Sequence, residues 1–317
     1  MPAIIGGSSS TGSSLLVNIL NRHSAIYAGP ETHLFTKPKL YQDWDKYKNT
    51  IQYKVGDALK SPGIHRYNGV ILDKLDTMIP MLSKAGRLSE FAHAYFDAYG
   101  KRDWVEKTPA NSYCFDFFLN EFDNGQVVLM VRNPYDTIAS MTARGISVLK
   151  AVSIYLANTL ANIDLQESER AYVVKYEALI NNPTTVLTQL CKFLNIPFES
   201  EMLTAEEGVI QMDGWQQNEK GKIEKSSVGR FLNLDDKLQK EIKTAADSLK
   251  LNNNAWPFKS VQEQDIGDIC LRFGYEYLEC NAGLSPTKMD LWKEELKSTL
   301  KLYPTNIFNY PISFKNR

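Results

Sequence analysis

Cysteines are few and long apolar runs are absent from this sequence. The four cysteines, Cys114, Cys191, Cys270 and Cys280, are scattered through 317 residues, and no two of them form the closely spaced pair of a zinc site or a redox motif. We therefore expect reduced thiols, no disulfide framework and no bound metal. No run approaches the roughly 20 apolar residues that a membrane helix needs, and no signal peptide precedes the first apolar segment. These absences predict a soluble, cytoplasmic protein.

An excess of charge of either sign is also lacking. The 36 Lys and Arg residues nearly balance the 37 Asp and Glu residues, which gives a formal net charge of -1. Such a chain has no bulk field that attracts nucleic acid or an anionic membrane, and we expect neither as a partner. An anion site would have to be built locally. Hydrophobic residues make up 43% of the chain, which is enough for a sizeable core.

A lysine is missing from the stretch GGSSSTGSS at residues 6–14. Gly7 and Gly12 have the spacing of a phosphate-binding P-loop, but Ser13 stands where that loop carries its lysine. The lysine of an ATPase meets the β- and γ-phosphates, so its absence argues against a kinase or NTPase, which stays an alternative. Backbone N–H groups, the helix dipole and the hydroxyls of Ser13 and Ser14 can still bind a 5′-phosphate. A plain Ser/Gly turn that caps a helix is the other interpretation.

Strand and helix patterns alternate along the chain. Four segments are predicted as strands: Ala3–Gly7, Trp104–Pro109, Gln126–Val131 and Ala171–Leu179. Helices are predicted at Ser14–Asn21, Arg87–Gly100, Pro183–Ile196 and from Pro134 onward, after the capping residue Asn133. The alternation predicts an α/β protein with a three-layer, P-loop-like fold, in which helices flank a central parallel sheet. We expect one domain over residues 1–317, with 36–100 as an inserted helical cover and 275–317 as a C-terminal appendage.

A second group of polar residues surrounds the end of the strand QVVLMV. Arg132 comes directly after this strand, at the edge where open α/β sheets bind ligands. Ser140 and Arg144 would be i,i+4 neighbours on one face of the helix that follows. Arginine and a hydroxyl together suit a phosphate, and a surface salt bridge with a buried serine is the alternative. Two separate phosphate sites indicate a ligand with two separated phosphates.

These segments together resemble the sulfotransferase superfamily, which uses 3′-phosphoadenosine 5′-phosphosulfate (PAPS). The resemblance is greatest to tyrosylprotein sulfotransferases and their bacterial relatives, and it runs in order over roughly residues 3–235. The matching segments are IIGGSSSTGSSLLVNILNRHSAIYAGPET, WVEKTPANS, VVLMVRNPYDTIASMTAR, VVKYEALINNP with LCKFLNIPF, and KIEKSSVGR. No single motif is decisive, but five in the family's order make a strong match.

The resemblance implies a role for each matching residue. The residues that would surround the 5′-phosphosulfate are Ser9, Ser10, Thr11, Gly12, Ser13 and Ser14. Those implied near the 3′-phosphate or elsewhere on the nucleotide are Arg132, Ser140, Arg144, Tyr176 and Arg230. Glu31 is implied as the general base, Lys107 as the cation at the sulfuryl group or leaving oxygen, and Ser226 as a contact in the same region.

Ser10 departs from the family pattern. The resemblance places Arg or Lys at this position, and losing that cation would cost about 2–4 kcal/mol of transition-state stabilisation, as the loss of an oxyanion donor does. Lys107, Lys37 and Lys39 are candidates to replace it. The alternative is a weak or inactive nucleotide-binding protein on the same fold.

Three questions stay open in the sequence. His33 is the second candidate for the general base. The acceptor is a hydroxyl of unknown identity, on a tyrosyl group, a sugar or a small metabolite, and we expect its pocket in residues 36–100 and the C-terminal segment. A homodimer is compatible with the sequence.

Overall fold

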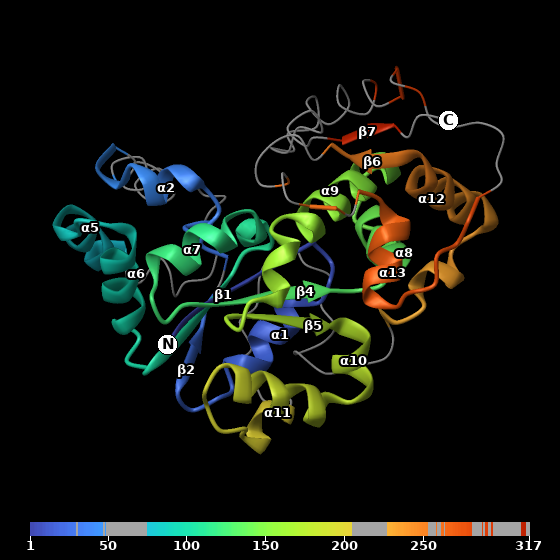
Figure 1. The fold of residues 1–317 in the computed structure, drawn as a ribbon. Helices are drawn as coiled ribbons and strands as arrows, with labels where there is room; N and C mark the ends of the chain where they lie inside the picture. Colours follow the sequence, from blue (N-terminus) through green and yellow to red (C-terminus); the bar gives the residue numbers. More distant parts are fainter. Residues whose placement is uncertain are drawn as a thin grey trace.

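The computed structural model in Figure 1 contains a central sheet whose strands all run in the same direction. It describes residues 1–29, 31–46, 48, 75–204, 227–252, 258, 261–262, 264–280, 287, 289–290, 293 and 312–314. The strands of this sheet are β1 (Pro2–Gly7), β2 (Ile26–Ala28), β3 (Asp103–Lys107), β4 (Gln126–Val131) and β5 (Ala171–Lys175). Their order is β2-β3-β1-β4-β5, and every neighbouring pair is parallel. The predicted α/β fold with a central parallel sheet is confirmed.

Apolar side chains of the sheet enter two separate cores. Along β4, Val128 and Met130 belong to one apolar cluster, whereas Val127, Leu129 and Val131 belong to the other. Successive side chains of a strand point to opposite faces, so a continuous apolar run can bury both faces of the sheet. This pattern explains why QVVLMV forms a central strand.

Helices cover both faces of the sheet. On one face lie α1 (Ser13–Leu20), α10 (Tyr176–Asn181) and α11 (Pro183–Phe193), with α10 and α11 below the sheet in Figure 1. The cluster on the other face includes residues of α7 (Phe115–Glu121), α8 (Pro134–Thr142), α9 (Val148–Leu160), α12 (Asp236–Ser248) and α13 (Ile266–Phe273). The same cluster continues into α2 (Pro38–Gln42), α5 (Leu75–Lys84) and α6 (Leu88–Asp97), at the left of Figure 1. Short 3₁₀ helices lie at Pro109–Cys114, Ile163–Glu167, Ser200–Leu203 and Arg230–Asn233.

Several predicted boundaries are wrong: helix α6 ends at Asp97 and not at Gly100, and strand β3 ends at Lys107 and not at Pro109. The segment expected as the strand Ala171–Leu179 ends as a strand at Lys175 and continues as α10. The buried residues Tyr176, Leu179 and Ile180 are spaced as i, i+3 and i+4, which is a helical and not a strand period. Helix α11 stops at Phe193 and not at Ile196, because Asn195 takes a left-handed backbone with φ 56°.

A small second sheet is formed by the C-terminal segment. Strand β7 (Ile312–Phe314) pairs antiparallel with β6 (Leu249–Leu251), which directly follows α12.

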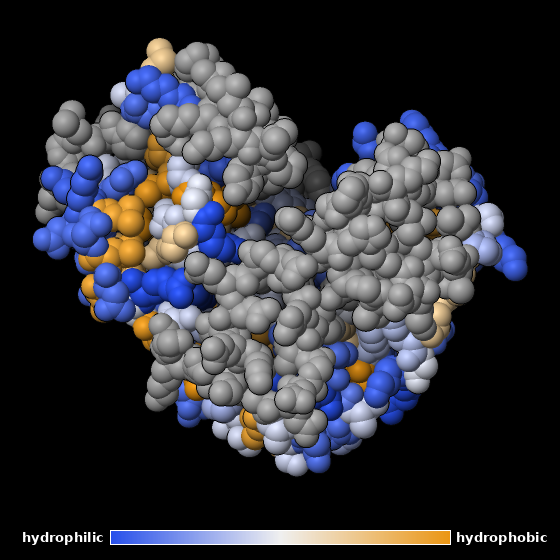
Figure 2. All heavy atoms as spheres, turned by 180° about the vertical axis from the view of Figure 1, so that it is seen from behind, coloured by the Kyte–Doolittle hydropathy of each residue, from blue (hydrophilic) through white to orange (hydrophobic). Residues whose placement is uncertain are grey.

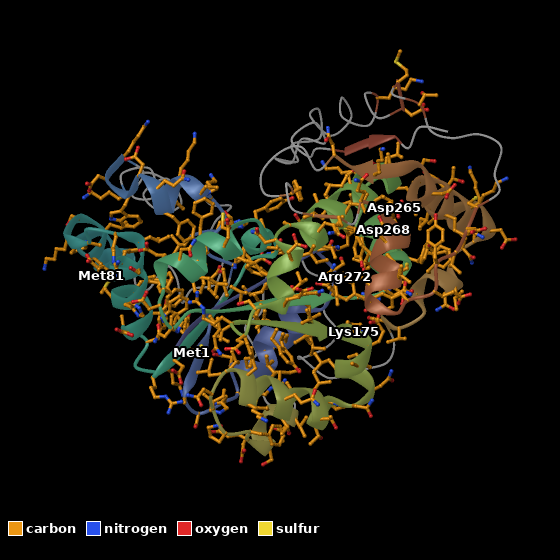
Figure 3. The ribbon with its side chains drawn as sticks, viewed as in Figure 1. Met1, Met81, Lys175, Asp265, Asp268 and Arg272 are labelled. Atoms are coloured by element: carbon orange, nitrogen blue, oxygen red, sulfur yellow. The ribbon has the colours of Figure 1, made fainter. Side chains whose placement is uncertain are left out.

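Figure 3 shows Lys175, the last residue of β5, beside Arg272 on α13, and the Lys175 ammonium donates to the Phe273 carbonyl. Elements far apart in the sequence therefore meet at the end of β5.

Within the described part of the chain, no helix combines the length and the apolar character that crossing a bilayer requires. Seen from behind, the described part of the surface mixes hydrophilic and hydrophobic residues (Figure 2).

Candidate functional site

The carboxyl ends of adjacent strands bring the predicted residues to one edge of the sheet. The Ser8–Gly12 loop follows β1, Lys107 ends β3, Arg132 follows β4 and Tyr176 follows β5. Strand β1 lies between β3 and β4, so the strand order reverses at the loop. Ligands of open α/β sheets bind at this kind of reversal.

The backbone of the loop depends on two glycines. Gly7 has φ 127°, and a Cβ atom there would lie 2.3 Å from the Met130 carbonyl oxygen. Gly12 has φ 90°, and a Cβ atom there would lie 2.4 Å from the Tyr176 ring. Both positions therefore need glycine, for conformation and for space. The Thr11 hydroxyl closes the loop from within by donating to the Ser8 carbonyl at 2.8 Å.

Helix α1 presents its positive end to this loop. Its N-cap is Gly12, and its first turn contains no acidic side chain. Partial positive charge at a helix N-terminus favours an anion, and no carboxylate in this turn opposes it. The loop and the helix start thus have the local geometry of a phosphate site without a lysine.

Arg132 joins the loop to a segment late in the chain. One guanidinium nitrogen donates to the Ser10 carbonyl at 3.0 Å, and another donates to the Ser227 carbonyl. The residue is 3% exposed, and its Cζ atom lies 4.7 Å from the centre of the Tyr176 ring. Burial lowers the pKa of Arg132, as does Arg230, while Tyr176 and Asp136 raise it. Among the described residues, none accepts a hydrogen bond from the Arg132 Nε atom.

Ser140 and Arg230, two candidate residues for the nucleotide, also meet. Arg230 donates to the Ser140 hydroxyl at 3.1 Å. The turn that carries Arg230 is held by Asp136, whose carboxylate accepts from the backbone N–H of Gly229 at 2.7 Å and of Phe231 at 2.9 Å. Asp136 lies in the first turn of α8, and its contacts position the turn that carries Arg230.

Arg144 differs from its predicted placement. Helix α8 ends at Thr142, so Ser140 and Arg144 are not neighbours on one helical face. The chain turns after the helix, and the Arg144 guanidinium donates to the Ser10 hydroxyl. Two arginines, Arg132 and Arg144, therefore contact the residue at which the sequence lacks a cation.

Glu31 and Lys107 form an ion pair beside the start of α1. The Lys107 ammonium donates to Glu31 Oε1 and, at 3.2 Å, to the Ser14 hydroxyl. The Lys107 side chain is 1% exposed and that of Glu31 is 10% exposed. His33, the second candidate base, places its Nε2 atom 4.0 Å from Glu31 Oε2, and its side chain is largely exposed. A carboxylate, a cation and the phosphate-type loop thus lie together.

Comparison with known proteins agrees with this geometry. A model described as the sulfotransferase family matches residues 2–200 of the chain.

The chain belongs to the sulfotransferase family.

A solved sulfotransferase structure has the same fold. The sulfotransferase domain of the olefin synthase from Synechococcus PCC 7002 aligns with a TM-score of 0.56 at 22% identity, over 74% of this chain and 88% of that one. The sulfotransferase domain from the curacin biosynthetic pathway has a TM-score of 0.49 at 23% identity, over 88% and 99%. Mouse SULT7A1, crystallised with PAP (3′-phosphoadenosine 5′-phosphate), has a TM-score of 0.41 at 14% identity, over 76% and 80%. No curated protein matches the chain. The first of these likenesses supports the fold.

For three residues predicted from the sequence, a role in the site of this sulfotransferase stays a prediction. Ser226 lies outside the described residues. Lys37 precedes α2 as its N-cap, and Lys39 lies within that short helix. The role of either lysine as a replacement cation stays a prediction.

One contributor, Ser227, was missed in the sequence, and it contributes its backbone carbonyl. Glu106, next to Lys107 on a buried strand, fits an interpretation from the sequence as a residue that orients its neighbours, and its carboxylate accepts from the backbone of Thr32. The Asp136 carboxylate accepts from the backbone of Gly229. A backbone carbonyl leaves no signal in the residue type.

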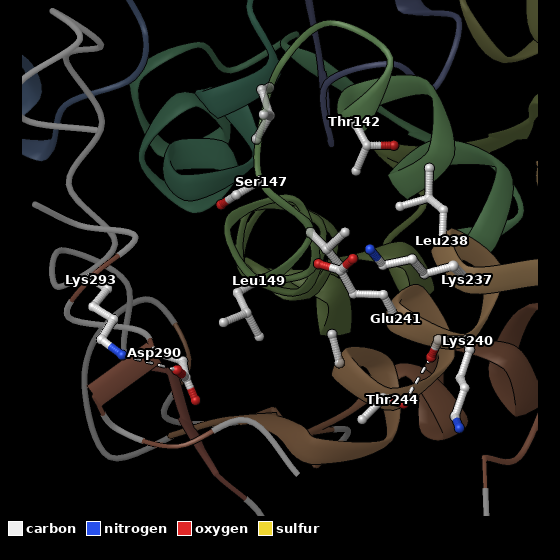
Figure 4. Close-up of a pocket in the computed structure, with 13 residues that line it drawn as sticks. Thr142, Ser147, Leu149, Lys237, Leu238, Lys240, Glu241, Thr244, Asp290 and Lys293 are labelled. Carbon is white, nitrogen blue, oxygen red and sulfur yellow. Dashed lines mark hydrogen bonds and ion pairs between the residues drawn. The ribbon is translucent and has the colours of Figure 1, made fainter. Parts of the chain in front are cut away.

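A cavity of about 900 Å³ lies apart from these residues. Figure 4 shows it between the segment from Thr142 to Leu149, helix α12, and Asp290 with Lys293. Among the described residues, those that line the cavity include Asp290 and Lys293 of the C-terminal segment and none of the candidate site residues. The acceptor pocket expected from the sequence stays a prediction.

Proposed function

We propose that this sulfotransferase moves a sulfuryl group from PAPS to a hydroxyl acceptor, with Glu31 as the general base. The observation that carries the proposal is that basic residues at the ends of the two strands beside β1, one on each side, contact the Ser8–Gly12 loop and the start of α1. Ser10 contacts Arg132 after β4, and Ser14 contacts Lys107 at the end of β3. A donor bound along this loop would have one phosphate near Arg132 and its transferable group near Lys107.

The nucleotide end of the donor would occupy the arginine side of the site. Arg132, Ser140 and Arg230 would bind the 3′-phosphate through charge-assisted hydrogen bonds. The loop from Ser9 to Ser14 and the N-terminus of α1 would bind the 5′-phosphosulfate. Tyr176, packed between Arg132 and Gly12, would shape the nucleotide site between the two phosphates.

The reaction would be an in-line displacement at sulfur. The acceptor oxygen forms a bond to sulfur while the bond from sulfur to the 5′-phosphate oxygen breaks, which releases PAP. Glu31 takes the proton of the acceptor hydroxyl. Lys107 already lies between Glu31 and Ser14, so its fixed charge can stabilise the sulfuryl or leaving oxygen as negative charge moves there.

Arg144 is our candidate for the cation that Ser10 does not provide. Its guanidinium contacts the Ser10 hydroxyl from outside the loop. A charge at this place would lie beside the loop that would bind the 5′-phosphosulfate. The loop would then receive its positive charge from the turn after α8.

Calorimetric titration of the wild-type chain with PAP, and with ATP and Mg²⁺ as the control, tests the donor class. We expect micromolar binding of PAP and much weaker binding of ATP. Preference for ATP would support a P-loop kinase instead. No PAP binding would leave the chain as a family member that does not use this donor.

A further inference from the structure

Glu106 is a buried carboxylate next to Lys107 on β3. It has no solvent exposure. Its Oε1 atom accepts from the Thr32 backbone N–H at 2.7 Å, the Thr32 hydroxyl at 2.9 Å and the Thr108 hydroxyl at 2.7 Å. Its Oε2 atom accepts from the Asn111 side-chain amide at 2.6 Å. Each of these partners donates, which suits an ionised carboxylate.

These contacts attach the segment that carries Glu31 to the end of β3. Thr32 directly follows Glu31 and gives both of its donors to Glu106. The backbone N–H of His33 donates to the Thr108 hydroxyl at 3.2 Å, and Thr108 itself donates to Glu106. His33 has a left-handed backbone with φ 57°, which is uncommon for a residue other than glycine. The turn is therefore held by contacts and not by its own preference.

Two consecutive residues of β3 thus restrain the same segment in different ways. Lys107 binds the Glu31 side chain, whereas Glu106 binds the backbone of the next residue. The strand's alternation directs neighbouring side chains to opposite sides. One short strand can in this way fix both the carboxylate and the chain that delivers it.

Burial makes this arrangement expensive for stability alone. Desolvation raises the pKa of Glu106, although the hydrogen bonds from Asn111 and Thr32 oppose the shift. A buried ion often stabilises a fold no more than a packed apolar group of similar volume. The carboxylate is better explained by the geometry that it imposes on residues 31–33.

We infer that Glu106 is a positioning residue that holds the Glu31 carboxylate in reach of Lys107 and of the acceptor hydroxyl. The hydrogen bonds show that Glu106 anchors the loop of residues 31–33. The consequence of this anchor for sulfuryl transfer rests on the proposed function. A small displacement of a reacting group can cost about 10²-fold in rate. Loss of the anchor should therefore reduce kcat far more than donor binding.

Paired variants separate the anchor from general stability. Glu106→Leu removes the acceptor, and Glu106→Gln keeps one amide oxygen for the Thr32 donors. Among the described residues, none donates to the Asn111 Oδ1 atom. A rotated Asn111 amide can therefore accept from the new glutamine, but it loses the hydrogen bond that its Nδ2 atom donates to the Ile5 carbonyl. Thr32→Val and Thr32→Ser repeat the comparison with a smaller change. Glu121→Leu is the matched control. The Glu121 carboxylate also accepts a hydrogen bond from a backbone N–H, that of Ser89, at a distance of 2.8 Å, but it lies away from the candidate site.

Hydrogen exchange of the peptide around Thr32 is measured without nucleotide, and turnover is measured with PAPS and 2-naphthol. We expect faster exchange and a fall in kcat of about 10²-fold in Glu106→Leu, a smaller change of the same kind in Thr32→Val, and PAP affinity close to wild type in both. Glu106→Gln and Thr32→Ser should recover most of the protection and of kcat. Glu121→Leu should change neither.

Unchanged exchange at Thr32 in Glu106→Leu and Thr32→Val would overturn the anchor. A fall in PAP affinity as large as the fall in kcat, together with a lower melting temperature, would show a general loss of structure and would overturn the positioning role. If the wild type bound no PAP, the proposed function would fail, and the exchange rates would still decide whether Glu106 holds the loop.

Discussion

The arginine group around Arg132 and the Glu31–Lys107 pair lie at the same edge of the sheet but differ in charge. Among the described residues, Arg132 and Arg144 meet at Ser10, and the Asp136 carboxylate lies 3.9 Å from Arg132. Around Lys107, one ammonium faces one carboxylate. With Arg230 and Glu177 included, three arginines face two carboxylates, so the first group has an excess of positive charge. The Glu31–Lys107 pair itself is balanced.

This difference separates binding from chemistry. An excess of buried positive charge is stable only when an anion compensates it, which suits a phosphate that stays bound throughout a reaction. A balanced pair can accept a proton on its carboxylate and keep its cation for developing negative charge. Substitutions on the two sides should therefore affect different kinetic quantities.

Glu31→Gln should have the largest effect on the chemical side. The amide keeps the shape of the side chain but cannot take a proton, so we expect kcat to fall by about 10²–10⁴-fold. PAP affinity should stay within a factor of two or so, since no phosphate contact is lost. Turnover of PAPS with a phenol acceptor and calorimetry with PAP measure the two quantities. His33→Gln is the control, and a reversed result in the two variants would make His33 the base.

Arg132→Ala should have the largest effect on the binding side. Loss of a charge-assisted contact costs about 1.5–3 kcal/mol, which corresponds to a drop in PAP affinity of about 10- to 100-fold. Arg132→Lys keeps the charge but not the paired contacts to Ser10 and Ser227, so its PAP affinity should lie between those of the wild type and Arg132→Ala. Melting curves of each variant show whether the loop contacts also support the fold. Unaltered PAP affinity in a folded Arg132→Ala protein would refute the 3′-phosphate assignment.

The fold could be predicted from the sequence where one physical signal dominated. The strand Gln126–Val131 was predicted with the residues that it has, because a chain buried on both faces has a continuous apolar run. The helix start at Pro134 was also predicted, and the Asn133 side chain accepts from Tyr135 N and Asp136 N as a cap. At Tyr176 the strand and helix signals overlap, and the helical period was assigned to the strand.

The site was predictable in its residue types but not in its contacts. Arg132 and Lys107 each follow or end a strand, so their place at the carboxyl edge could be inferred from the pattern. The contact of Glu106 with Thr32 joins residues that are 74 positions apart, and no local pattern records it. The reach of Arg144 depends on where α8 ends and how the chain turns afterwards. Long-range packing decides both.

Arg144→Ala tests whether the two sides share the loop. A contact at the Ser10 hydroxyl places this charge near the 5′-phosphate, so PAP and AMP should lose affinity by the same factor, about 2- to 10-fold for one hydrogen bond. A role at the 3′-phosphate predicts a loss for PAP and none for AMP. Calorimetry with both nucleotides decides between these places, and Arg132→Ala, which should weaken PAP more than AMP, is the control.

The smallest expected effect is on the pH dependence of stability. It concerns Glu106, which lies next to Lys107 of the Glu31–Lys107 pair. Burial raises the pKa of Glu106 above its usual value near 4.5, so the folded chain takes up this proton at a higher pH than the unfolded chain does. The stabilisation from proton uptake is fully present below the usual pKa and is lost as the pH rises through the raised value. Glu106→Gln lacks this transition. Urea denaturation of both proteins between pH 7 and about pH 4.5 should therefore show the wild type gaining on Glu106→Gln as the pH falls. A constant difference over this range would mean that the carboxylate is not desolvated, and that the anchor costs the fold nothing at neutral pH.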